Sequence, residues 1–429
     1  MFWTTLISVL VATASSGIAL GVALGLTGLI LLQFFNYGST YLALDTIWGI
    51  FNSFTLSAVP LFILLGEILL KSGISERAYA AFTPIFARIP GGLLHSNVAV
   101  CTLFGAVSGS SLSTAAAIGS VAYPELSKRG YDKETVVGSL AGAGTLGLLI
   151  PPSLSLLIFG ALTETSIGRL FAAGILPGLM VSALFMCFIF FLCVRNPSLA
   201  PKDTTTYTMS FILQGLLRIW PILMLILAIM GSIMFGIATP TEAAAIGVGA
   251  AIFISFIWGD MTVNTLMVSI YKSALLFASI GFIVLGAAIL SQSVSILGVP
   301  QTILEAAINS GLDRYGIFVL IILIYVLFGC VFDGLSLMVM TLPIVFPLLT
   351  GLGFDPIWIG VMITILIEIG QVTPPVGLNL SVLTTITGGE ISLGRTAIAT
   401  VPYWLILILA IGLITLVPEI VLLLPDAIF

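Results

Sequence analysis

The sequence predicts an all-α protein that crosses a membrane many times and consists of two inverted repeats. Of the 429 residues, 59% are hydrophobic and 7% are charged, against roughly 25% charged residues in an average soluble protein. The apolar residues form long, nearly uninterrupted runs, as in spanning helices and not in the alternating strands of a barrel. The second half of the chain also repeats motifs of the first half.

Composition excludes several classes of function. The formal net charge is −5, so no basic face for nucleic acid is expected. The single histidine, His95, excludes most histidine-ligated metal sites. The four cysteines lie in apolar runs without a C-x-x-C pair, so no disulfide framework is expected. No cofactor is expected, and no cleavable signal peptide, because the first apolar stretch runs from Phe2 to about Phe35.

The apolar runs define the expected segments in order. The first stretch divides at residues 15–17 into two spans, and several later runs exceed the about 20 residues that cross a bilayer. The expected segments are 2–14, 17–36, 44–70, 93–127, 135–165, 169–194, 212–237, 240–258, 264–290, 315–347, 357–387 and 396–425.

An internal repeat relates the two halves at an offset of 223 residues. Pro151-Pro152 falls on Pro374-Pro375, and the Gly-Tyr-Asp motif at 130–132 falls on the Gly-Phe-Asp motif at 353–355. After a slip of three residues, the Ser-x-Gly-Arg motif at 166–169 falls on its copy at 392–395. Chance does not produce matching proline pairs and polar motifs in so apolar a chain, so the repeat indicates duplication.

Each half is expected to hold five crossings and one re-entrant hairpin. The first repeat is 1–197, with a hairpin at 93–127 and a broken helix at 135–165. A cytoplasmic linker at 198–211 leads to the second repeat, 212–429, with a hairpin at 315–347 and a broken helix at 357–387. An odd number of crossings turns the second copy upside down, which is the plan of many secondary transporters.

The basic residues set the expected orientation. With the N-terminus on the outer side, eleven of the thirteen Lys and Arg residues lie on or near the cytoplasmic face, and only Arg169 and Arg314 lie outside. Both termini are therefore expected on the outer side. The first hairpin is expected to open from the cytoplasm and the second from the opposite face.

Polar residues interrupt both hairpins midway. The run at 108–114 (S-G-S-S-L-S-T) lies in the first hairpin, and the run at 332–336 (F-D-G-L-S) lies in the second. Because Gly and Ser break helices, each hairpin is expected to be two half-helices that meet at a polar tip. Five hydroxyls in the first run favour a binding tip, and the alternative is a Gly/Ser face for helix packing.

The proline pairs mark a second polar feature in each half, at 147–153 (G-L-L-I-P-P-S) and 370–376 (G-Q-V-T-P-P-V). Two prolines remove two backbone donors and unwind the helix. Carbonyls freed in this way are costly in a membrane unless a partner such as a dehydrated Na⁺ meets them. The half-helix that follows presents its N-terminus to an anion. The alternative is a simple proline kink.

Two carboxylates inside the apolar runs, Asp333 and Glu368, are candidates for a cation site or for holding the hairpin together. Glu242 is expected to cap a helix. Arg169 and Arg395 are expected to anchor loops at the interface, although either could reach an acidic substrate.

These motifs resemble the large membrane subunit of tripartite ATP-independent periplasmic (TRAP) transporters. The similarity lies in the runs at 104–120 (F-G-A-V-S-G-S-S-L-S-T-A-A-A-I-G-S), 147–153, 238–245 (A-T-P-T-E-A-A-A) and 371–379 (Q-V-T-P-P-V-G-L-N), and it extends over essentially the whole chain. It implies Na⁺-driven uptake of a small organic acid across the bacterial inner membrane by an elevator movement. It also implies a small membrane (Q) subunit and a periplasmic substrate-binding (P) protein.

On this resemblance the hairpin tips and unwound segments form the Na⁺ and substrate region. The expected Na⁺ ligands are Ser108, Ser110, Ser113, Gly147, Pro151, Gly329, Asp333, Gly334, Ser336, Gly370, Thr373 and Val376. The expected substrate ligands are Ser110, Ser111, Ser153, Ser336, Gln371, Gly377 and Asn379. Symmetry implies two Na⁺ sites.

Other functions remain open from the sequence. A stand-alone Na⁺/dicarboxylate symporter would work without a binding protein. An intramembrane hydrolase would use Ser108 or the Asp333 and Glu368 pair, but the residues around Ser108 lack a G-x-S-x-G spacing. An open channel is disfavoured because no ring of identical pore segments occurs. The sequence leaves the cargo open among sialic acid, C4-dicarboxylates and other small carboxylates, and the expected protein is a transporter and not an enzyme.

Overall fold

A computed structural model describes residues 2–15, 18–201, 219–309 and 311–429, together with the single residues 208, 210, 213, 215 and 217. Within these residues the secondary structure is helical and no strand occurs. The all-α prediction is therefore confirmed for the described part of the chain. Most of the expected linker at 198–211 and the beginning of the expected span at 212–237 lie outside it.

The helices keep the order that the apolar runs predict. They are α1 (Phe2–Ser15), α2 (Leu20–Phe35), α3 (Leu42–Phe51), α4 (Ala58–Lys71), α5 (Ile74–Phe86), α6 (Leu93–Ser108), α7 (Ser111–Lys128), α8 (Lys133–Leu149), α9 (Leu154–Thr163), α10 (Ile167–Arg195), α12 (Trp220–Met234), α13 (Pro240–Ile257), α14 (Val263–Ile296), α15 (Val299–Asn309), α16 (Arg314–Gly329), α17 (Gly334–Gly351), α18 (Pro356–Gln371), α19 (Leu378–Ile386), α20 (Leu393–Leu416) and α21 (Glu419–Ile428).

In the part of the chain that the structure describes, six helical segments are long and apolar enough to cross a membrane, and a seventh results if a bent pair counts as one span. The bent pair corrects the expected straight crossing at 44–70, because α3 and the helix that ends at Lys71 meet at 54°. The expected crossing at 396–425 also divides, since α20 ends at Leu416 and α21 begins at Glu419. Two helices, α5 and α15, were not predicted, because their runs are shorter and more polar than the spans.

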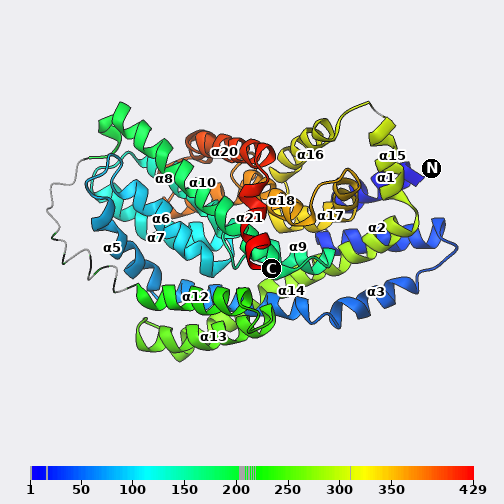
Figure 1. Ribbon diagram of the computed structural model, residues 1–429, viewed down its shortest axis with the longest axis horizontal. Helices are drawn as coiled ribbons and strands as arrows, with labels where there is room; N and C mark the ends of the chain where they lie inside the picture. The colour runs from blue at the N-terminus through cyan, green and yellow to red at the C-terminus, as the bar shows by residue number, and fades with distance from the viewer. Residues whose placement is uncertain are drawn as a thin grey trace.

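The helices form two groups. One group, the support layer, consists of α2, α3, α4, α12, α13 and α14, in which α14 packs along α2 and α4 and α13 packs on α4. In Figure 1, α12, α13, α14 and α3 follow the lower edge of the molecule. The second group, the hairpin core, holds α6 and α7, α16 and α17, and the helices α8, α9, α18 and α19 that pack on them.

Among the described residues, four ion pairs join positions that are far apart in the sequence. They are Arg77–Asp260 at 3.3 Å, Lys133–Glu390 at 2.7 Å, Arg395–Glu134 at 3.4 Å and Arg169–Asp426 at 2.6 Å. The first three join residues that the sequence places on the cytoplasmic face, and the last joins two residues expected outside. Exposed pairs of this kind stabilise little. The pairs bear on the orientation of the chain, because each one joins two residues that are expected on the same side of the membrane.

One of these pairs, Lys133–Glu390, also shifts the pKa of a carboxylate outside the spanning segments. The Lys133 ammonium donates to the Glu390 carboxylate, and the Tyr123 hydroxyl donates to the same oxygen at 2.8 Å. Both contacts lower the pKa of Glu390 below its ordinary value.

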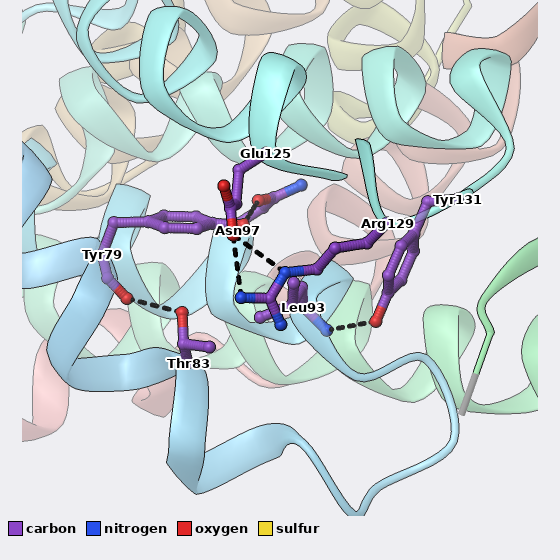
Figure 2. A network of polar contacts seen from close by, with 7 residues as sticks. All are labelled: Tyr79, Thr83, Leu93, Asn97, Glu125, Arg129 and Tyr131. Carbon is purple, nitrogen blue, oxygen red and sulfur yellow. Dashed lines mark hydrogen bonds and ion pairs between the residues drawn. The ribbon is translucent and has the colours of Figure 1, made fainter. Parts of the chain in front are cut away.

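Buried hydrogen bonds hold the base of the first hairpin (Figure 2). The Tyr79 hydroxyl of α5 donates to Asn97 of α6 at 3.0 Å, and the Asn97 amide donates to Ser139 of α8 at 2.9 Å. The backbone N–H of Leu93 donates to the Tyr131 hydroxyl at 3.2 Å. Since buried hydrogen bonds are costly to break, the hairpin base is tied to α5 and α8.

The support layer contains an unusually close helix contact. A Cβ atom on Gly286 of α14 would lie 1.8 Å from the carbonyl oxygen of Gly21 in α2, and one on Gly21 would lie 2.2 Å from the carbonyl oxygen of Phe282. Small residues let membrane helices approach in this way. The absence of side chains at Gly21 and Gly286 therefore sets the distance between α2 and α14.

We expect Gly286→Ala to destabilise the protein by about 1–3 kcal/mol, because a methyl group has no room and the helices must separate. The measurement is the thermal midpoint at which the detergent-purified protein loses its monodisperse elution peak. The control is Gly281→Ala on the same helix, where a Cβ meets no atom within 4 Å. Equal midpoints for the two variants would contradict the close contact.

Candidate functional site

The first hairpin tip is a short polar turn between α6 and α7. Gly109 has a φ of +59°, a conformation that glycine adopts without strain. Ser110 caps α7 by accepting a hydrogen bond from the N–H of Ser113. The Ser108 and Thr114 hydroxyls lie 2.7 Å apart, and Thr114 donates to the Ser110 carbonyl at 2.8 Å. The tip is therefore an ordered turn that presents hydroxyl and carbonyl oxygens.

The first proline pair interrupts a helix as expected. The helix α8 ends at Leu149, and α9 begins at Leu154 after a cis Pro151–Pro152 bond. The carbonyl of Leu148 loses its helical donor, but the hydroxyls of Ser153 and Ser155 donate to it, the latter at 3.1 Å. Serine side chains thus satisfy one of the oxygens that the break exposes.

The second hairpin tip is capped by a carboxylate. Asp333 precedes α17, and its Oδ2 accepts from the N–H of Ser336 at 2.9 Å and from the Ser336 hydroxyl at 2.5 Å. A negative charge at a helix N-terminus is favourable. Asp333 therefore holds the tip together and also lines the pocket described below.

The second proline pair also interrupts a helix. The helix α18 ends at Gln371 and α19 begins at Leu378, with a cis Pro374–Pro375 bond between them. The Thr373 hydroxyl donates to the carbonyl of Ile369 at 2.5 Å. The Ile369 carbonyl also accepts the backbone N–H of Val372 at 3.2 Å, so the threonine adds a second donor to it.

A backbone hydrogen bond joins each break to its hairpin tip. The N–H of Leu154 donates to the carbonyl of Gly109 at 3.3 Å, and the N–H of Val376 donates to the carbonyl of Cys330 at 3.1 Å. In both halves, therefore, a donor that follows the proline pair contacts the end of the first hairpin arm.

A glycine contact accompanies each of these hydrogen bonds. A Cβ on Gly105 would lie 2.8 Å from the Cα of Gly147, and a Cβ on Gly329 would lie 2.8 Å from the Cα of Gly370. The hairpin arm and the helix that precedes the proline pair thus touch through their backbones. Together, the hydrogen bond and the glycine contact join each tip and its break into one unit, which we call a tip–break unit.

The two units meet at one cavity of about 240 Å³, which we call the central pocket. Both hairpin tips, both breaks and the support helices α4 and α14 line it. Its polar side chains are Glu67, Ser108, Ser110, Ser111, Ser113, Ser279, Asp333 and Gln371. No basic side chain lines it among the residues that the structure describes. The pocket lies between the hairpin core and the support layer.

Several buried oxygens beside the second break have no hydrogen-bond donor. They are both carboxylate oxygens of Glu368, Oε1 of Gln371 and Oδ1 of Asn379. Ser111 and the backbone of Leu148 lie next to Glu368, and the Asn379 amide donates to the Ser111 hydroxyl at 2.7 Å. Buried acceptors without donors are costly, so this region suits a cation or a ligand that supplies donors.

The structure brings together part of the predicted site. Six of the predicted ligands line the central pocket: Ser108, Ser110, Ser111, Ser113, Asp333 and Gln371. Three others contact residues of this set, namely Gly147 beside Ser110, Gly334 beside Gln371 and Asn379 on Ser111. Ser153 points to the backbone of Leu148 and does not line the pocket. The remaining ones, Pro151, Gly329, Ser336, Gly370, Thr373, Val376 and Gly377, lie in the tips and breaks behind it.

Sequence reasoning missed two polar residues of the pocket, Glu67 in α4 and Ser279 in α14. Both come from the support layer, which carries no helix-breaking motif. Glu67 did leave a signal, because it is the only acidic residue between Asp45 and Glu76, and a lone carboxylate within a span is functional by default.

The donor set fits Na⁺ better than a transition metal. Among the described residues no group of three or more His, Cys, Asp or Glu side chains could hold a metal ion. The tips and breaks instead supply carbonyls, hydroxyls and a few carboxylate oxygens, the ligands that hard cations prefer.

We expect Gly147→Ala to weaken Na⁺ binding, because the new methyl group would lie 2.5 Å from the Thr114 hydroxyl and 2.6 Å from the Ser110 carbonyl. Displacing these oxygens should raise at least tenfold the Na⁺ concentration that gives half-maximal thermal stabilisation of the purified protein. Gly412→Ala, where a Cβ meets no atom within 4 Å, is the matched control. An unchanged Na⁺ dependence in Gly147→Ala would remove the first tip–break unit from the site.

The chain resembles known membrane proteins over almost its whole length. The family model described as "Tripartite ATP-independent periplasmic transporter, DctM component" matches residues 6–420. The chain is 32% identical to the C4-dicarboxylate TRAP transporter large permease protein DctM of Pseudomonas aeruginosa, over 94% of each chain. It is 34% identical to the ectoine TRAP transporter large permease protein TeaC of Halomonas elongata, over 87% of each. It is 28% identical to the sialic acid TRAP transporter large permease protein SiaM of Vibrio cholerae, over 96% of this chain and 95% of the other.

A solved structure shares the fold. The YdaH transporter of Alcanivorax borkumensis superposes with a TM-score of 0.61 over 88% of each chain, at 13% sequence identity. At this sequence identity, the similarity supports only the fold of the chain and not its function.

Proposed function

The chain belongs to the DctM component family of tripartite ATP-independent periplasmic transporters, and from this premise we propose that it couples the inward movement of Na⁺ to uptake of a small organic acid. It is a multi-pass membrane transporter and not an enzyme, which removes the intramembrane hydrolase as an alternative. The organic acid carries at least one carboxylate, as C4-dicarboxylates and sialic acid do, and the membrane is the bacterial inner membrane with both termini periplasmic.

The observation that carries the Na⁺ proposal is the pair of tip–break units. Each one gathers backbone carbonyls and hydroxyls at a point where a helix is interrupted inside the membrane. Such oxygens lack helical donors, and a desolvated cation compensates them without introducing a second net charge. Because the arrangement occurs twice, two Na⁺ ions follow, one for each unit.

The organic acid is proposed to bind in the central pocket, where Ser110 and Ser111 begin α7. The N-terminal N–H groups of a half-helix and its positive dipole end favour a carboxylate. Bound Na⁺ adds positive charge close by. The acid therefore binds well only after the cations have bound, and this order is the origin of coupling.

Movement is proposed to follow the division of the structure into two groups. The tip–break units bind their ligands within the hairpin core, while the support layer forms the opposite wall of the pocket. An elevator movement carries the loaded hairpin core across the membrane against the support layer. A half-loaded core would expose polar groups without partners, and it therefore crosses slowly.

We expect Ser110→Ala and Thr373→Ala each to reduce Na⁺-dependent uptake at least tenfold in proteoliposomes, since each removes a hydroxyl oxygen from one unit. Ser232→Ala is the comparison variant, because Ser232 lies on α12 of the support layer, outside both units and outside the lining of the central pocket. The measurement is initial uptake as a function of Na⁺ concentration. If both variants keep the wild-type Na⁺ dependence, the proposed cation sites are wrong.

Transporters of this family work with a small membrane subunit and a periplasmic binding protein. We propose that this chain does so too, against the alternative of a stand-alone symporter. Proteoliposomes that contain the chain and its small membrane subunit should take up the acid only when the binding protein is present. Equal uptake from free substrate without that protein would instead establish the stand-alone symporter.

A further inference from the structure

The central pocket has an acidic wall that the cation sites do not explain. Glu67 lies on α4 of the support layer and lines the pocket, one residue after Gly66, where a Cβ would lie 2.7 Å from the carbonyl oxygen of Ser108. Its side chain is 8% exposed, and its Oε2 atom is buried without a hydrogen-bond partner. A buried carboxylate oxygen in this state is costly unless something binds to it.

Neighbouring groups of the protein do not pair with Glu67. Lys272 and Lys71 are the cations that act on it electrostatically, but both lysine side chains are exposed, and neither lines the pocket. Asp333, the other carboxylate of the pocket, accepts two hydrogen bonds from Ser336. Glu67 is therefore the acidic group of the pocket that lacks a donor from the described residues.

The internal repeat separates Glu67 from the paired Na⁺ sites. The motif at 62–66 matches the motif at 282–286, so the position equivalent to Glu67 is Ala287. A group that served the duplicated cation sites would be expected in both halves. Glu67 occurs once, as does the central pocket between the halves. Glu67 is therefore suited to contact the transported molecule, because the single pocket holds one such molecule.

The charge of the pocket restricts that molecule. Two carboxylates and no basic side chain line the pocket among the described residues. A dianion would place its second negative charge near these two carboxylates, in a pocket whose described lining has no basic side chain. A molecule with one carboxylate and one cationic nitrogen would instead satisfy the half-helix N-terminus at one end and Glu67 at the other.

We propose that Glu67 binds a cationic nitrogen of the transported acid, so that the preferred substrate is a small zwitterion. This inference rests on the proposed function, since it concerns the acid bound beside the Na⁺ sites. The pocket volume of about 240 Å³ is below the about 300–1,000 Å³ of pockets for drug-sized ligands, so the molecule is compact. The assignment makes Glu67 a residue that determines specificity within the support layer.

The test compares three acids on the full-length chain purified with its small membrane subunit. Pipecolate carries a carboxylate and a ring ammonium, cyclohexanecarboxylate has the same ring size without the nitrogen, and succinate is a dianion. Thermal stabilisation at saturating Na⁺ gives the half-maximal concentration of each acid. Because charge-assisted hydrogen bonds are strong, we expect the value for pipecolate to be at least tenfold lower than the other two.

The variant Glu67→Gln should abolish this preference while leaving the cyclohexanecarboxylate value within about twofold. Glu67→Asp should keep part of it. Glu164→Gln is the control, because Glu164 lines two neighbouring cavities but not the central pocket, and it should behave as wild type. If Glu67→Gln does not fold, the test rests on two results: whether the wild type prefers pipecolate, and whether Glu67→Asp keeps part of that preference.

Three results would overturn the inference. The wild type could bind succinate or cyclohexanecarboxylate as tightly as pipecolate, or Glu67→Gln could weaken all three acids equally. Glu67→Gln could also raise the Na⁺ requirement without any acid, which would make Glu67 a cation ligand. These outcomes leave Na⁺-dependent binding of acids intact. If no acid stabilises the protein in Na⁺, the proposed function fails, and this inference fails with it.

Discussion

The structure depends on the backbone contact between a hairpin tip and an interrupted helix, which occurs once in each half. Glycines at 105 and 147, and again at 329 and 370, let the chains touch. The N–H groups of Leu154 and Val376, which follow the proline pairs, then donate to the carbonyls of Gly109 and Cys330. Without these contacts the breaks would leave polar backbone in the membrane. With them, two half-helices, a hairpin tip and a set of oxygens are held at one place.

The two tip–break units are not chemically equal, and the difference fits their roles. In the first unit, hydroxyls of Ser153 and Ser155 satisfy the exposed Leu148 carbonyl. In the second, Glu368 and nearby amide oxygens stay buried without donors. The repeated tip–break units therefore account for the proposed pair of cation sites, while the polar groups that occur in one half surround the single central pocket. Glu67, on the support layer, belongs to this unpaired set.

Much of this organisation could be predicted from the sequence, because it rests on local chemistry. Proline pairs cannot continue a helix, and Ser-Gly runs end one, so the breaks at 150–153 and 372–377 and the tips at 109–110 and 330–333 were expected near their places. The bend between α3 and α4 was not predicted, although a local signal was present. The polar residues Asn52, Ser53, Thr55 and Ser57 interrupt the run at 44–70 at the place where α3 ends.

The site was harder to predict than the fold. The residues around Ser108 and Asp333 were expected together because they repeat, whereas Glu67 and Ser279 reach the pocket only through the packing of the support layer on the hairpin core. Residues such as Thr373 and Ser153 were expected to face a ligand, yet their hydroxyls donate to carbonyls of their own breaks. The direction of a side chain at a helix break depends on which exposed carbonyl lies nearest, and the order of residues does not show this.

The most direct test of the account is equilibrium binding of radioactive ²²Na⁺ to the purified protein in the absence of any organic acid. The account predicts saturable binding of two ions per chain that unlabelled Na⁺ displaces and that K⁺ or choline does not. No saturable binding, or equal displacement by K⁺, would show that the oxygens of the interrupted helices do not form Na⁺ sites.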